Sequence, residues 1–256
     1  MPAVRVRGAD LHYEVRGKGE PVVLCHGFLD NCSVWEGLAE TIAGKRTVVM
    51  YDQRGHGLSD KPRGGYSVRS LAQDLRGLIL GLHLDRAAVV GHSLGGMIAL
   101  TLALEYPDLV SQLVLVCTTA RLVPQPQITG RIMAGMSYLV PYAMFAQKIM
   151  KLRFVDPSEE AVDTGSDRVT RTPKHVAYDC GKGLLTGYDV RRSVSRVKAP
   201  TLILAGEKDR GAPVAMSRLL HREIKGSRLH IMPGCGHLPM IEKPREFGSL
   251  LLDFLG

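Results

Sequence analysis

The chain has 256 residues, with 45% hydrophobic and 23% charged residues, which is ordinary for a globular protein with a substantial core. Its formal charge is +8, but the basic residues are scattered and only 5% of residues are aromatic. Nucleic-acid modules concentrate basic residues in a stripe with aromatic side chains between them, so we expect no nucleic-acid partner.

The N-terminal sequence and the cysteines bear on location. No apolar window approaches the roughly 18 residues of a membrane span. The opening residues, MPAVRVRGAD, lack the apolar core of a secretory signal. The 5 cysteines are odd in number and form no CxxC pair, which argues against a disulfide framework and a zinc site. We expect a cytoplasmic protein with reduced thiols.

Short apolar runs alternate with helical patterns along most of the chain. Strands are expected at 3–7, 11–16, 21–25, 47–51, 87–90, 113–117, 201–205 and 228–232. Helices are expected at 33–43, 67–80, 94–105 and 244–254. Ser33 is the expected N-cap of the first helix, with Glu36 completing a capping box. Strands separated by helices predict right-handed crossovers and a mostly parallel α/β sheet.

The rhythm changes between residues 121 and 195. This region has no good buried strand, is rich in methionine and is interrupted by five prolines. It is therefore predicted to be a helical insertion into a core formed by residues 1–120 and 196–256. We found no internal repeat.

Ser93 is the strongest candidate for chemistry. Residues 91–96 read GHSLGG, directly after an apolar strand and at the start of a helix. A GxSxG sequence in this context is the signature of a nucleophile elbow. The glycines leave room for a sharp turn, and the helix N-terminus places positive potential beside the hydroxyl. Ser93 is the predicted nucleophile.

A serine that attacks a carbonyl needs donors for the developing oxyanion. The backbone amide of Leu94 is one candidate. The other is the amide of Phe28 in the loop after the strand at 21–25, where Gly27 allows close approach. His26 in the same loop is interpreted as a buried residue that holds the loop.

The predicted general base is His237, in the loop after the last strand. A serine hydroxyl is a weak nucleophile at neutral pH without such a base. The orienting carboxylate is expected four residues beyond another strand, at Asp209. Its rival is Glu207 in the same loop, but Asp209 is favoured because of its longer reach.

These motifs resemble the α/β-hydrolase fold superfamily, and most closely its serine carboxylesterase, lactonase and cofactor-free haloperoxidase branch. The resemblance rests on segments HGF, YDQRGHGLSD, GHSLGG, GEKD and GCGHLPMIEKP, at 26–28, 51–60, 91–96, 206–209 and 234–244. It implies an eight-stranded, mostly parallel sheet flanked by helices, with residues 121–195 forming a helical cap over the site. Branches that use an aspartate nucleophile do not fit, since position 93 is serine.

The expected reaction is hydrolysis of carboxylic esters of short to medium acyl chains, with no metal or organic cofactor. A lactonase, a perhydrolase or haloperoxidase, a carbon–carbon bond hydrolase and a small-molecule receptor that keeps the triad remain as alternatives. The substrate is expected to be a small ester or lactone, and the oligomeric state is left open. Residues expected to line the substrate pocket are Leu29, Met133, Met136, Met144, Phe145 and Leu238.

Overall fold

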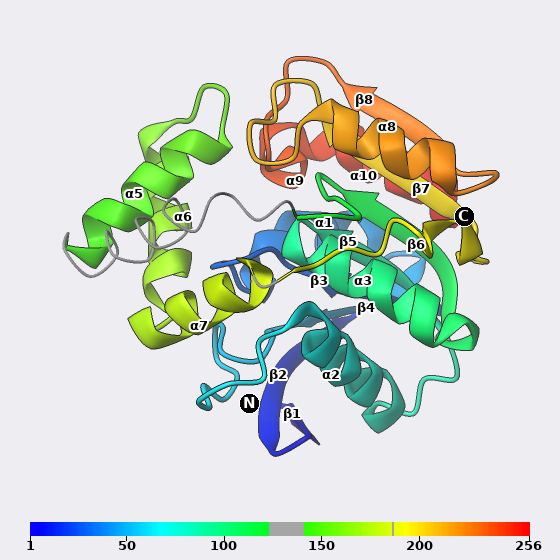
Figure 1. Cartoon of the computed structure of the whole chain (residues 1–256), viewed down its shortest axis with the longest axis horizontal. Coiled ribbons are helices and arrows are strands. Elements are labelled where there is room, and N and C mark those ends of the chain that lie inside the picture. Colours follow the sequence, from blue (N-terminus) through cyan, green and yellow to red (C-terminus); the bar gives the residue numbers. More distant parts are fainter. Residues whose placement is uncertain (123–140, 186) are drawn as a thin grey trace.

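The computed structural model describes residues 1–122, 141–185 and 187–256 (Figure 1). Within these residues, eight strands form one sheet in the order β1-β2-β4-β3-β5-β6-β7-β8. The strands are β1 (Ala3–Val6), β2 (Ala9–Arg16), β3 (Glu20–Cys25), β4 (Arg46–Tyr51), β5 (Ala87–His92), β6 (Val110–Val116), β7 (Thr201–Gly206) and β8 (Arg228–Met232).

Only β2 runs against the other strands of the sheet. β1 pairs antiparallel with β2, and β2 pairs antiparallel with β4, whereas the remaining neighbours are parallel. The carboxyl ends of the parallel strands therefore share one edge of the sheet. Ligand sites of open α/β sheets lie outside this edge. The predicted mostly parallel α/β fold is confirmed.

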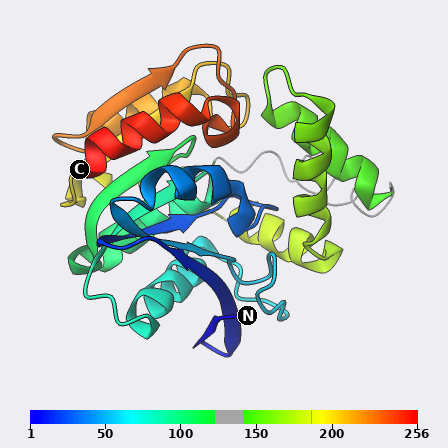
Figure 2. The same ribbon diagram turned by 180° about the vertical axis from the view of Figure 1, so that it is seen from behind.

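Helices cover both faces of the sheet. Figure 1 shows α2, α3 and α8 in front of the strands, and Figure 2 shows α1 and α10 in front from the other side. The described helices are α1 (Glu36–Ile42), α2 (Val68–Gly81), α3 (Leu94–Glu105), α5 (Tyr142–Arg153), α6 (Glu159–Thr170), α7 (Lys174–Leu185), α8 (Val214–Glu223), α9 (Pro239–Glu242) and α10 (Pro244–Leu255), with short 3₁₀ helices η1 (Cys32–Trp35), η2 (Pro107–Leu109) and η3 (Val194–Arg196).

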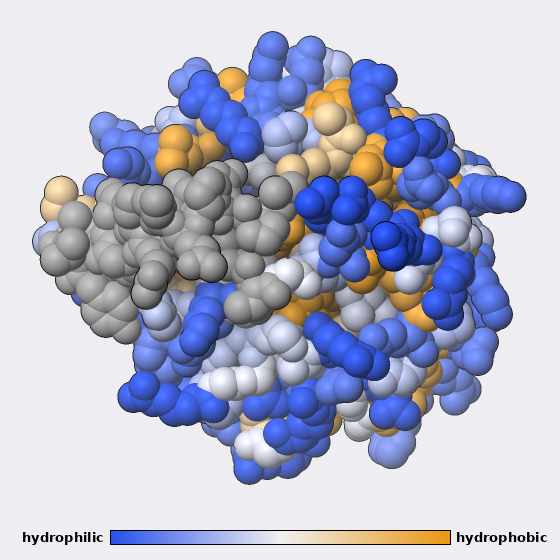
Figure 3. Space-filling model, in the orientation of Figure 1, coloured by the Kyte–Doolittle hydropathy of each residue, from blue (hydrophilic) through white to orange (hydrophobic). Residues whose placement is uncertain are grey.

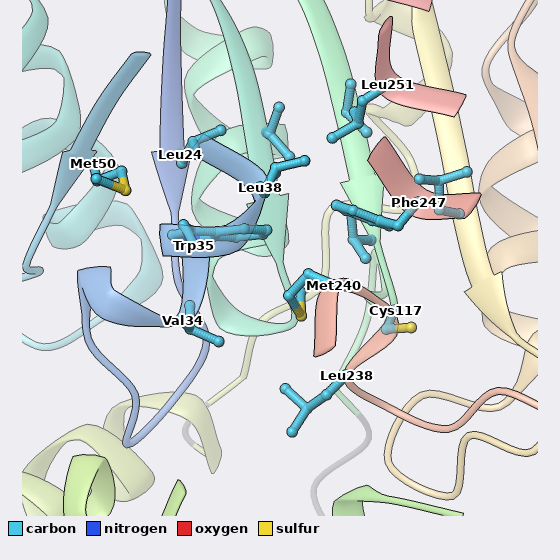
Figure 4. Close-up of a cluster of buried hydrophobic side chains, with 14 of the residues drawn as sticks. Leu24, Val34, Trp35, Leu38, Met50, Cys117, Leu238, Met240, Phe247 and Leu251 are labelled. Carbon is cyan, nitrogen blue, oxygen red and sulfur yellow. The ribbon is translucent and has the colours of Figure 1, made fainter. Parts of the chain in front are cut away.

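Successive residues of the central strands enter two different hydrophobic clusters. Val22 and Leu24 of β3 belong to the cluster beneath α1 and α10, whereas Val23 and Cys25 belong to the one beneath α2 and α3. This is the two-residue alternation of a strand that is buried on both faces. Figure 4 shows part of the first cluster, around the fully buried Trp35.

The ring of Trp35 stacks against Phe247 of α10 with ring centroids 6.4 Å apart. This contact joins the start of α1 to the last helix of the chain. All five cysteines are buried and free.

One local prediction is wrong. The expected helix at 33–43 begins as η1, and its N-cap is Asn31, whose side chain accepts the N–H of Ser33 at 3.1 Å. Ser33 instead donates its own hydroxyl to the same Asn31 oxygen, and no capping box forms at the start of α1. Asn31 and Ser33 lie two positions apart, and both are residue types that commonly cap helices.

Helices α5, α6 and α7 lie together between β6 and β7 in the chain order, beside the carboxyl ends of the parallel strands (Figures 1 and 2). They are called the cap below. Hydrophilic residues cover most of the face in Figure 3, and hydrophobic ones show between them in separate patches. No helix of the described residues is long and apolar enough to cross a membrane.

Candidate active site

Ser93 lies at the turn between β5 and α3, with backbone angles φ 53° and ψ −115°. A positive φ is strained for a residue with a side chain, at a cost of about 1–3 kcal/mol. The turn is held from both sides, because Ser93 donates its N–H to Val116 at 2.9 Å and accepts the Thr118 hydroxyl on its carbonyl at 2.7 Å. A side chain at Gly91 would overlap the Gly95 carbonyl, so the motif glycines are required sterically.

His237 and Asp209 form a buried hydrogen-bonded pair. His237 Nδ1 and Asp209 Oδ2 are 2.8 Å apart, and both residues are less than a tenth exposed. The other Asp209 oxygen accepts the N–H groups of Gly211 at 2.7 Å and Ala212 at 3.0 Å. Burial alone would raise the pKa of Asp209, but the hydrogen bonds from His237 and these amides outweigh it and hold the pKa below its usual value.

Glu207, the rival carboxylate, has a different partner. Its side chain is largely exposed and accepts the N–H of Gly234 at 2.9 Å. It thus braces the loop after β8 without a hydrogen bond to His237 in the described structure. The geometry brings Asp209, and not Glu207, to the imidazole.

The loop that carries His237 is joined to the elbow by His92. His92 Nε2 donates to the His237 carbonyl at 2.7 Å, and the two rings lie 4.8 Å apart. Burial, together with the charge of His237, lowers the pKa of His92 to about 3. A neutral His92 with its proton on Nε2 is the form that can donate this bond.

The loop after β3 lies against the elbow. A side-chain carbon at Gly27 would lie 3.4 Å from Ser93 Cβ, which shows how closely the backbone approaches. His26 Nε2 accepts the N–H of Gln53 at 3.1 Å, so its Nδ1 carries the proton and donates to the Gly27 carbonyl at 2.8 Å. His26 therefore holds this loop from within.

The two amides predicted to form the oxyanion hole are available. Leu94 is the first residue of α3, where an N–H has no carbonyl partner within the helix. The N–H of Phe28 makes no hydrogen bond within the described part of the chain. Leu94 follows Ser93 directly in the chain. Phe28 follows Gly27, whose backbone lies close to the side chain of Ser93.

The residues predicted to line the pocket lie in different surroundings. Leu29 and Leu238 are fully buried in the cluster beneath α1 and α10, and Phe145 packs partly against the same cluster. Met144 is 61% exposed. Met133 and Met136 lie outside the described residues. The assignment of these residues to a substrate pocket stays a prediction.

Several contributors to this geometry escaped the sequence analysis. Thr118 and His92 fix the elbow, and Glu242 accepts the N–H groups of Gly236 and Leu238, each at 3.1 Å. His92 and Glu242 stand inside the motifs at 91–96 and 234–244, whereas Thr118 lies in no recognisable motif. The contacts that these three residues make are not revealed by spacing in the sequence.

Two groups of side chains in the described residues are of types that bind metals. One is His12, Glu14 and Cys32, and the other joins Cys117 to Asp209 and His237; in each, the ligand atoms lie within 4.8 Å of one another. In the second group the Asp209–His237 hydrogen bond already occupies one potential ligand atom of each residue.

A serine at a strand–helix elbow, joined through His92 to the loop of a histidine–aspartate pair at the carboxyl edge of an eight-stranded sheet, is the arrangement typical of α/β hydrolases. Residues 20–244 match the family model described as the alpha/beta hydrolase fold. The chain belongs to this family.

Individual relatives differ in what they act on. The chain is 28% identical to 2-hydroxy-6-oxo-6-phenylhexa-2,4-dienoate hydrolase of Comamonas testosteroni, covering 96% of this chain and 91% of the relative. The solved enol-lactonase of Burkholderia xenovorans is 27% identical, with a TM-score of 0.90 over 99% of both chains. A solved N-acyl homoserine lactone degrading enzyme is 30% identical, with a TM-score of 0.87 over 99% of this chain and 100% of its own.

We predict that the buried histidines make the protein acid-sensitive. Burial lowers the pKa of both His56 and His92 from 6.5 to about 3. Below pH 6.5 the unfolded chain binds protons on these residues that the folded chain does not bind. The contribution of each neutral, buried histidine to the free energy of unfolding should therefore be fully present above pH 6.5. It should be lost as the pH falls from 6.5 towards 3, by about 1.4 kcal/mol per pH unit for each histidine.

Urea denaturation between about pH 5 and 7 measures this slope. In His92→Gln, an amide N–H₂ can still donate to the His237 carbonyl, and the slope should decrease by about one proton. Equal slopes for the variant and the wild type would contradict the neutral state of His92.

Proposed function

We propose that the protein is a serine hydrolase that cleaves carboxylic esters of short to medium acyl chains through an acyl-enzyme on Ser93. The observation that carries the proposal is the 2.8 Å bond between His237 and Asp209, on a loop that His92 ties to the elbow of Ser93. Membership of the alpha/beta hydrolase fold family supports the hydrolase class. The ester specificity is inferred from the chemistry of the site.

In the first half-reaction, Ser93 Oγ attacks the ester carbonyl carbon while His237 Nε2 takes the hydroxyl proton. The bond to Asp209 holds the proton of His237 on Nδ1, which leaves Nε2 free to act as the base. The carbonyl oxygen becomes an oxyanion and is stabilised by the N–H groups of Phe28 and Leu94. When the intermediate collapses, His237 returns the proton to the departing alcohol.

In the second half-reaction, water attacks the acyl-enzyme. His237 takes a proton from the water, the same two amides receive the oxyanion, and the proton then passes to Ser93 Oγ as the carboxylic acid leaves. Over the whole cycle the ester and one water become an acid and an alcohol, and Ser93 and His237 return to their starting states. We therefore propose a reaction that needs no added cofactor.

Lactones are the second candidate substrates. A lactone is a cyclic ester, so the same attack opens its ring, and the alcohol stays attached to the acyl group. The likeness to an enol-lactonase and to an N-acyl homoserine lactone degrading enzyme, both over 99% of this chain, favours this candidate.

We further propose that residues 121–195 act as a domain that roofs the site and limits the acyl chain. The position of α5, α6 and α7 beside the carboxyl edge of the sheet supports this division (Figure 1). A roofed pocket favours ligands that it can enclose.

We expect Ser93→Ala to abolish ester hydrolysis and to keep the fold, because only the nucleophilic oxygen is removed. A fluorophosphonate should label the wild type at Ser93 alone, as read by peptide mass spectrometry. Ser59 is a suitable control for unspecific labelling and should stay unlabelled. Its hydroxyl is buried and donates to the Asp52 carbonyl at 2.6 Å. Labelling of another serine would sink the assignment.

Asp209→Asn should lower kcat by a factor of about 10³–10⁴, because the amide no longer selects the reactive tautomer of His237. Glu207→Gln is the matched control, since it alters the other acidic side chain of the same loop. It should change kcat by less than about threefold, a loss of well under 1.4 kcal/mol. A reversal of the two effects would transfer the role to Glu207.

A panel of p-nitrophenyl esters and lactones tests the substrate class. Each CH₂ that enters an apolar pocket should add about 0.8 kcal/mol of binding, until the pocket is full. The specificity constant should therefore rise and then fall, with its peak at short to medium acyl chains. If Phe145 lines the pocket, Phe145→Ala should move the peak to longer chains. A steady rise through long chains with activation at an oil–water interface would instead indicate a lipase.

A further inference from the structure

Arg153, the last residue of α5, contacts both loops that meet at Ser93. Its guanidinium Nη2 donates to the Phe28 carbonyl at 2.5 Å, and its own backbone carbonyl accepts the N–H of His237 at 2.8 Å. The side chain is only 13% exposed. A single residue of the cap thus touches the loop of the proposed oxyanion donor and the loop of the proposed base.

The contact with Phe28 completes a set of restraints on the oxyanion loop. The peptide unit that contains the Phe28 N–H is held through its Gly27 carbonyl, which accepts His26 Nδ1–H at 2.8 Å. In the unit after Phe28, the N–H of Leu29 donates to His56 Nε2 at 3.3 Å, while the carbonyl accepts Arg153. Removal of Arg153 would leave that second unit held from the core side only.

The contact with His237 is reinforced nearby. Two residues beyond Arg153, the N–H of Val155 donates to Glu242 at 3.1 Å. The same carboxylate accepts the N–H groups of Gly236 and Leu238, which flank His237. The end of α5 is therefore bonded to the His237 loop through both its backbone and this shared carboxylate.

A second arginine of the cap provides a contrast. Arg168 Nε donates to the buried carboxylate of Asp30 at 2.7 Å, whereas Arg153 Nη1 lies 3.7 Å from the other oxygen of Asp30. Burial lowers the pKa of Arg153, and Asp30 offsets part of this effect. Arg168 is thus the main ion-pair partner of Asp30, whereas Arg153 donates the hydrogen bond to Phe28.

We propose that Arg153 is a positioning residue that couples docking of the cap to the alignment of the oxyanion hole and the base. It touches no reacting atom. Its guanidinium sets the Phe28 loop and its carbonyl sets the His237 loop, so both are aligned when α5 is in place. The catalytic part of this inference rests on the proposed function of Ser93.

The test compares Arg153→Met with the matched control Arg168→Met. Loss of one oxyanion donor costs enzymes about 10²–10³ in kcat, and a donor that is merely less well held should cost less, about 10-fold. Arg153→Met should lower kcat and the rate of Ser93 phosphonylation by this factor with KM changed by less than about twofold. Arg168→Met should keep both rates within about twofold, even if it lowers the melting temperature as much.

A second, more conservative variant keeps the test informative if Arg153→Met fails to fold. Arg153→Lys keeps a positive charge beside Asp30 but lacks the fork of the guanidinium, and its rates should fall between those of wild type and Arg153→Met. Equal losses in Arg153→Met and Arg168→Met would show a general effect of the Asp30 ion pairs and overturn the proposal. Wild-type rates in Arg153→Met would overturn it as well.

Hydrogen exchange provides a readout that does not depend on catalysis. In Arg153→Met, peptides that cover 26–31 and 234–238 should both exchange faster, whereas Arg168→Met should leave 234–238 unchanged. If wild-type Ser93 resists phosphonate labelling, the proposed function fails, and the exchange data still decide whether Arg153 couples the two loops. Unchanged exchange at both segments in Arg153→Met would refute the coupling.

Discussion

The pairing of Asp209 with His237 depends on how closely the loops after β7 and β8 approach each other. A side chain at Gly206 would overlap the Gly236 carbonyl, so the two loops meet backbone to backbone. The parallel register, in which Gly206 faces Met232, brings both loops off the same edge of the sheet. The rest of the site is arranged around this contact, since His92 and Arg153 both bind the backbone of His237.

Much of this arrangement could be predicted from the sequence, because it is encoded in local patterns. The glycines within two residues of Ser93 are required sterically by the sharp turn, and the continuous apolar runs indicate strands that are buried on both faces. The distance of Asp209 beyond the strand end favours it over Glu207, and the structure places Asp209 against His237. That both act in catalysis remains a proposal.

What could not be predicted depends on contacts between distant residues. Arg153 and Phe28 are 125 positions apart, and nothing near either residue indicates the other. Asn31, and not Ser33, is the N-cap, and because both are residue types that cap helices, cap preference alone does not distinguish them. Local chemistry specifies which residues can make a contact, and the fold determines which of them do.

The five buried cysteines also allow the stability of different layers to be measured. Burial raises the pKa of the thiols of Cys25 and Cys180 to about 12, with Cys25 in the central sheet and Cys180 in α7 of the cap. A thiol reacts with alkylating agents as its thiolate, so both are shielded chemically as well as sterically while the protein stays folded. The rate at which each thiol is alkylated in native buffer therefore measures how often the structure around it opens. Of the five buried cysteines, Cys180 lies in the cap and the other four lie in the core, so the opening of the two layers can be timed separately once the alkylated cysteine is identified.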